Sequence, residues 1–77
     1  MTAAVSVADA FAEGLHREQA LTLRREGWTW QQWWDRKLEL DEWIEQVKAD
    51  GADRLEIAGL QGRLMCVCAE GRKRFGS

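Results

Sequence analysis

Residues 54–69 decide the fold class of this 77-residue chain, and they read RLEIAGLQGRLMCVCA. In the first part, the apolar residues Leu55 and Ile57 alternate with charged ones, and residues 64–68 are apolar on both alternating sides. Alternation with a period of two is typical of β-strands, and the glycines of residues 59–62 favour a turn between them. The stretch therefore predicts an antiparallel β-hairpin over 54–69.

The residues that flank this stretch predict a helix before it and a basic edge after it. Asp41 is a suitable N-cap for a helix that ends at Asp50, with Gly51 as its stop signal. After a turn at residues 70–71, the basic sequence over 71–77 predicts a short edge strand.

Residues 18–40 fit two interpretations. In the helical one, a first helix ends at Gly27, and Thr29 caps a second helix with Gln32 completing a capping box. In the other interpretation, the side chains of residues 20–24 alternate between two faces, and so do those around Trp28 and Trp30. The two segments would then be the strands of a hairpin. We favour helix here, preceded by a helix over 6–16 that Ser6 caps.

These elements predict one small α+β domain over residues 1–77, with a helical, Trp-rich part over 1–50 packed on the C-terminal hairpin. No apolar run reaches the roughly 18 residues of a membrane span. The first twelve residues lack a basic region and include Asp9, and two cysteines are too few for a disulfide framework. We therefore expect a cytoplasmic protein that does not enter membranes.

The sequence contains no pattern that predicts an enzyme, a metal site or a cofactor. His16 is the single histidine, and no glycine-rich phosphate loop is present. Cys66 and Cys68 would need two further ligands for a zinc site. We expect no catalytic residue, no metal and no cofactor.

The five tryptophans instead predict a surface that binds another macromolecule. Four indoles could bury about 600–1,000 Å², of which a small domain must bury a large part. Helical or strand geometry leaves one or two of them outside the core, and we expect Trp28 or Trp33 to be exposed. Tryptophan beside arginine is typical of binding hot spots. The predicted partner-binding residues are Trp28, Trp30, Trp33, Trp34, Arg25, Arg36, Arg72, Lys73 and Arg74.

Two alternative functions remain open. Residues 24–36 resemble the opening of a helix-turn-helix motif, and the hairpin could serve as a wing. The helix that would enter the DNA groove carries a net charge of −3 over residues 41–50, which argues against direct DNA binding. The other alternative is a structural homodimer whose tryptophans form the dimer core.

Residues 41–77 resemble, in their layout, the C-terminal half of some small phage-encoded anti-CRISPR proteins. The resemblance rests on the short helix, the two segments 54–57 and 63–68 around a glycine turn, and the basic residues 71–75. It covers about half of the chain. It implies a non-enzymatic inhibitor that docks on an RNA-guided Cas complex in the bacterial cytoplasm and blocks target DNA binding or cleavage.

Overall fold

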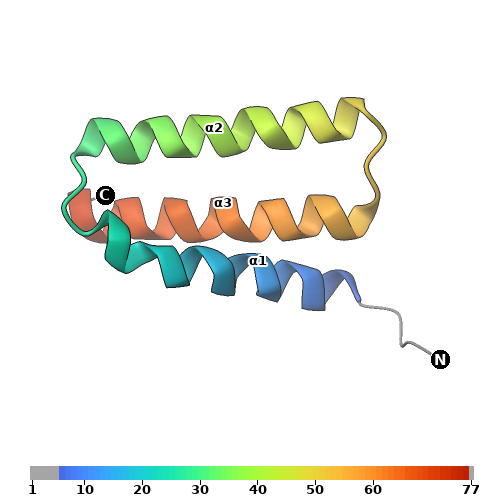
Figure 1. The fold of residues 1–77 in the computed structure, drawn as a ribbon, viewed down its shortest axis with the longest axis horizontal. Coiled ribbons are helices and arrows are strands. Elements are labelled where there is room, and N and C mark those ends of the chain that lie inside the picture. The colour runs from blue at the N-terminus through green and yellow to red at the C-terminus, as the bar shows by residue number, and fades with distance from the viewer. Residues whose placement is uncertain (1–5, 77) are drawn as a thin grey trace.

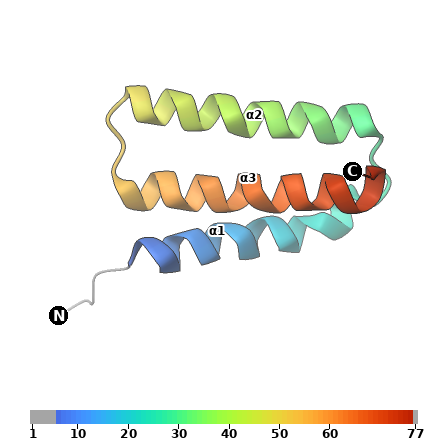
Figure 2. The ribbon, with the colours of Figure 1, turned by 180° about the vertical axis from the view of Figure 1, so that it is seen from behind.

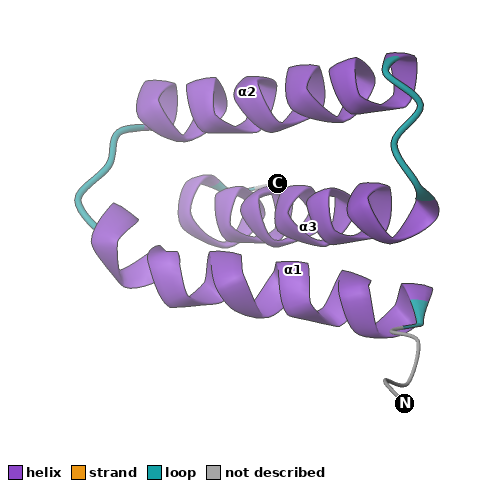
Figure 3. Ribbon diagram, turned by 45° about the vertical axis from the view of Figure 1, so that its right-hand side comes forward, coloured by secondary structure: helices purple, strands orange, loops and turns teal. Residues whose placement is uncertain are grey.

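The computed structural model describes residues 6–76 and is helical throughout, without a strand in that range (Figure 3). Three α-helices and one short 3-10 helix follow each other along the chain, namely α1 (Val7–Thr22), η1 (Leu23–Arg25), α2 (Trp30–Ala49) and α3 (Arg54–Phe75). The prediction of an α+β domain is therefore wrong, because residues 54–69 and the basic segment 71–75 both belong to α3.

Helix α3 lies between α1 and α2, and both pack against it, whereas the backbones of α1 and α2 barely meet (Figures 1 and 2). The resulting layer measures 44 × 26 × 20 Å. Its apolar core between α2 and α3 contains Trp33, Leu40 and Val67, with Trp34 and Leu64 packed against it. None of the helices within residues 6–76 combines the length and the apolar character that a membrane crossing requires.

A helix replaces the predicted hairpin because the same residues also have a helical period. Leu60, Leu64, Val67 and Gly71 are spaced three or four residues apart, so in a helix they share one side, and this side faces α2. A hairpin over the same residues would leave this set divided between two faces. The long helix buries it in one interface.

The glycines that favoured a turn instead let α1 and α3 approach closely. A Cβ atom at Gly62 would lie 2.2 Å from the carbonyl oxygen of Phe11, and one at Gly14 would lie 1.9 Å from that of Gly59. Glycine in a helix costs about 1 kcal/mol relative to alanine. Here the missing side chains offset that cost because the two backbones can pack against each other.

The helix boundaries follow side-chain caps. Ser6 accepts a hydrogen bond from the Asp9 amide, and Thr29 forms the predicted capping box with Gln32, so both predictions are confirmed. The prediction that Asp41 caps a helix is wrong, because Asp41 lies inside α2 and pairs with Lys37 at 3.3 Å.

Helix α2 runs without interruption from Trp30 to Ala49. The helix-turn-helix alternative needs a turn within this range and a wing after it. Residues 54–68 form part of α3 instead of a wing. The geometry of a winged helix-turn-helix is therefore missing from residues 24–68.

Candidate protein-binding face

Trp33 is the buried tryptophan of the chain and anchors α2 on α3. Its side chain is 8% exposed, and its indole Nε1 donates a hydrogen bond to the Val67 carbonyl oxygen at 2.6 Å. A Cβ at Gly71 would lie 1.8 Å from the Trp33 ring, so the glycine makes room for the indole. The expectation that Trp33 is exposed is therefore wrong.

The exposed tryptophans are Trp30 and Trp43, at 48% and 42%, whereas Trp28 and Trp34 are half-buried. The rings of Trp30 and Trp34 stack one helical turn apart, with centroids 5.3 Å apart and planes 11° from parallel. Lys37 places its ammonium 4.6 Å from the Trp34 ring centroid, which is a cation–π contact. The stacked pair is thus held in place although one ring remains half in solvent.

The Trp30–Trp34 pair lies on one broad side of the layer that α2 and α3 form, beside the helix–helix contact and not within it. Trp34 and Leu64 both pack against the core, and Ile57, Cys68 and Phe75 lie in the same helical row of α3 as Leu64. Phe75 is 39% exposed in this row, and Met65, three residues before Cys68, is 57% exposed on the adjoining solvent side of α3. We call this surface the apolar face, and it consists of Trp30, Trp34, Ile57, Leu64, Met65, Cys68 and Phe75.

Arg25, predicted to contact a partner, is instead buried in the protein. Its side chain is bound on one side by Glu18, with Nη1 at 2.8 Å from Oε2, and on the other by Glu70, with Nη2 at 2.5 Å from Oε2. All three residues are less than 8% exposed. Burial alone would lower the pKa of Arg25, but hydrogen bonds and charges from Glu70 and Glu18 outweigh it and raise the pKa.

Two further arginines extend this buried group into an ionic network that joins all three helices. Arg36 on α2 contacts Glu18 at 2.5 Å, and Arg74 on α3 contacts Glu70 at 3.3 Å. Arg74 also donates to the backbone carbonyls of Thr22 and Arg25. Both arginines are mostly buried, and their contacts stabilise the fold.

The remaining predicted basic residues, Arg72 and Lys73, are exposed in the last turn of α3. They lie on a helix end and not on an edge strand, so the predicted position of the basic segment is corrected. Cations at this position interact favourably with the negative end of the helix dipole. Of the nine predicted binding residues, the structure thus leaves Trp30, Arg72 and Lys73 exposed.

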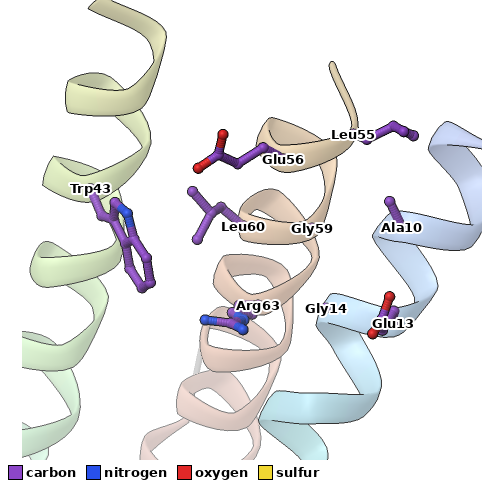
Figure 4. Close-up of a pocket in the computed structure, with 9 residues that line it drawn as sticks. All are labelled: Ala10, Glu13, Gly14, Trp43, Leu55, Glu56, Gly59, Leu60 and Arg63. Atoms are coloured by element: carbon purple, nitrogen blue, oxygen red, sulfur yellow. The ribbon is translucent and has the colours of Figure 1, made fainter. Parts of the chain in front are cut away.

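On the opposite side from the apolar face, Trp43 and α3 line a small open pocket against α1 (Figure 4). The pocket has a volume of about 160 Å³, and its floor includes Gly59 and Leu60. Arg63 lies 5.7 Å from the Trp43 ring centroid, so the cation–π contact occupies part of the opening. Glu13 and Glu56 give the rim acidic groups.

Cys66 is buried beside the ionic network, and burial raises the pKa of its thiol above the usual value. The thiol is therefore neutral at physiological pH and a poor nucleophile. Within residues 6–76, no cluster of three or more His, Cys, Asp or Glu side chains is arranged to hold a metal ion.

The exposed apolar residues that the sequence interpretation missed include Leu23, Leu38, Met65 and Phe75. On α3, the helical spacing of Ile57, Leu64, Cys68 and Phe75 is the signal that would have placed Phe75 in the row of Leu64, with Met65 next to that row. Comparison of the chain with protein-family models, with curated proteins and with solved structures finds no match.

Proposed function

We propose that the chain is a non-enzymatic protein-binding module and that the apolar face is its contact surface. The observation that carries this proposal is the stacked Trp30–Trp34 pair, which remains partly in solvent while Met65 and Phe75 are exposed on the neighbouring helix. Tryptophan and methionine are enriched in interface cores relative to ordinary surfaces. Contiguous apolar surface of this kind is typical of an interaction site.

The composition of this face also favours a protein partner over nucleic acid. Single-stranded nucleic acid binds aromatic platforms that have an excess of basic neighbours. The Lys37 ammonium beside Trp34 is already paired with the Asp41 carboxylate at 3.3 Å. The aromatic side chains are thus placed in a locally balanced charge environment, which suits a partner protein.

The anti-CRISPR function stays a prediction. Its resemblance rests on a hairpin layout, and the corresponding residues are helical in the structure. Binding to a Cas complex would be one case of the proposed module, with the partner being the effector protein.

A pair of variants tests the proposal. Met65→Glu places a charge in the middle of the apolar face, and Ala20→Glu places the same charge on exposed α1 outside it. Tagged wild type, Met65→Glu and Ala20→Glu are used to capture proteins, including a purified Cas effector and the chain itself, with circular dichroism as the folding control. We expect wild type and Ala20→Glu to bind a protein that Met65→Glu does not. Equal capture by all three folded proteins would overturn the proposal.

A titration with labelled duplex DNA at 50 and 300 mM NaCl addresses the DNA alternative. We expect weak binding that Met65→Glu leaves unchanged. Tight binding with a steep salt dependence would contradict the assignment of a protein partner.

A further inference from the structure

The charges of this protein are divided between the two ends of the helical layer. Residues 18–37 and 66–76 lie at the end where α1 stops and α2 begins, and they contain seven Lys and Arg against four Asp and Glu, a net charge of +3. Residues 6–17 and 38–65 lie at the other end and contain four Lys and Arg against nine Asp and Glu, a net charge of −5. We call these regions the basic end and the acidic end.

This division is visible only in the folded protein, because each end combines segments that are distant in sequence. The longest dimension of the protein is 44 Å, which is several times the Debye length of about 10 Å at 0.1 M salt. Each end therefore interacts with a neighbouring molecule largely independently of the other end.

The apolar face extends along both ends. Trp30, Trp34 and Phe75 lie at the basic end, Ile57 lies at the acidic end, and Met65 lies near the middle of α3. A surface that buries itself against a second copy must be self-complementary about a two-fold axis. An axis near Met65 would place the aromatic side chains of one copy over the Ile57 region of the other.

Charge decides the direction of such a pair. In a parallel pair, two basic ends and two acidic ends would meet, and like charges repel. In an antiparallel pair, each end of net charge +3 meets an end of net charge −5. The antiparallel arrangement is therefore favoured at both ends at once.

We propose that the partner of the apolar face is a second copy of this chain, packed antiparallel with Met65 close to the two-fold axis. This inference rests on the proposed function, because it names the protein that the face binds. An unrelated acidic protein would match the basic end only and would leave the acidic end of this chain without a complement.

Sedimentation velocity over about 1–300 µM protein, at 50 and 500 mM NaCl, tests the inference. We expect wild type and Ala20→Glu to change from monomer to dimer with concentration, and Met65→Glu to need at least ten-fold more protein to dimerise. Because opposite charges meet, we expect the dimer of wild type to weaken several-fold at 500 mM NaCl. Arg72→Glu, at an exposed position of the basic end, should weaken the dimer at low salt and have less effect at high salt.

Three results would overturn it. If the dimer becomes tighter as salt is added, the two copies do not pack antiparallel. If folded Met65→Glu dimerises like wild type, the apolar face is not the dimer interface. Wild type that remains monomeric over the whole range excludes self-association. If Met65→Glu nevertheless loses capture of another protein, the proposed function stands and only the identity of the partner is wrong.

Discussion

At the scale of single residues, Trp33 and Gly71 form one packing unit. The Trp33 indole reaches the Val67 carbonyl, which a regular helix already pairs with the amide of residue 71. A side chain at position 71 would occupy the place of the ring. The buried Trp33 Nε1 can therefore donate its hydrogen bond only because α3 has a glycine at position 71.

We expect Gly71→Ala to lower the free energy of unfolding by about 3 kcal/mol, because the new Cβ overlaps the Trp33 ring and breaks its hydrogen bond. The matched control is Gly27→Ala, where no atom lies within 4 Å of the added Cβ and the backbone φ is not positive. That change should stabilise the protein by about 0.4–1 kcal/mol. Urea unfolding followed by tryptophan fluorescence measures both, and equal effects would contradict this account.

The Cys66 thiol makes stability depend on pH in the alkaline range. Its pKa is raised in the folded protein, whereas in the unfolded chain it titrates near its ordinary value of about 8.5. The folded state thus binds the proton more tightly, so the contribution to stability is present below pH 8.5 and is lost as the pH rises further.

We expect urea unfolding to show a lower free energy of unfolding at pH 9.5 than at pH 7.5, and Cys66→Ala to reduce this decline. The control is Cys68→Ala, because Cys68 is half-buried on α3. This variant should show the same decline as wild type. A decline of the same size in Cys66→Ala and wild type would assign the pH dependence to other groups.

At the scale of elements, α3 shows why the sequence was misinterpreted. Its apolar residues fit a period of two over 64–68 and a helical period over 60–71, and the two patterns share the same residues. The glycines were interpreted as turn residues, but contact with α1 determines their role. Local caps such as Thr29 could be predicted, whereas the close approach of two distant helices could not.

The sequence also contains a local signal for the start of α3, which the hairpin interpretation does not use. Asp53 accepts a hydrogen bond from the Glu56 amide at 2.9 Å and begins the helix. We expect Asp53→Ala to lower the free energy of unfolding by about 1 kcal/mol. Asp53→Asn should retain most of the stability of wild type, because asparagine can also cap a helix. The control is Asp50→Ala, at the other side of the loop, which should change stability by less than about 0.5 kcal/mol. Thermal unfolding followed by circular dichroism compares the three variants, and equal losses at Asp50 and Asp53 would count against the cap.

At the scale of the whole molecule, the ionic network joins all three helices, including α1 and α2, whose backbones barely meet. Glu18 and Arg36 connect α1 to α2, and Arg25 connects both to Glu70 on α3. The sequence predicts that Arg25 and Arg36 bind a partner, whereas in the structure they form internal ion pairs. These pairs could not be predicted because the residues that pair with the arginines lie up to 45 positions away. The exposed tryptophans were likewise predictable as a class, whereas the identity of the exposed indoles depended on the contact of α2 with α3.

We expect Arg25→Met to lower the free energy of unfolding by about 3–5 kcal/mol, because Glu18 and Glu70 would remain buried without their cation. The control, Arg17→Met, removes an exposed ion pair with Glu13 and should cost less than about 0.5 kcal/mol. Urea unfolding of both variants at pH 7 provides the comparison. Similar costs for the two substitutions would contradict the structural importance of the network.

The position of α3 between the other two helices has a consequence for synthesis of the chain. Because α1 and α2 pack on α3 and barely on each other, residues 6–49 can form few tertiary contacts, such as the Glu18–Arg36 ion pair, until the last helix has been translated. During translation, Trp33 and the apolar side of α2 remain in contact with water or with a chaperone. Folding on the ribosome must therefore wait for α3 to emerge from the exit tunnel.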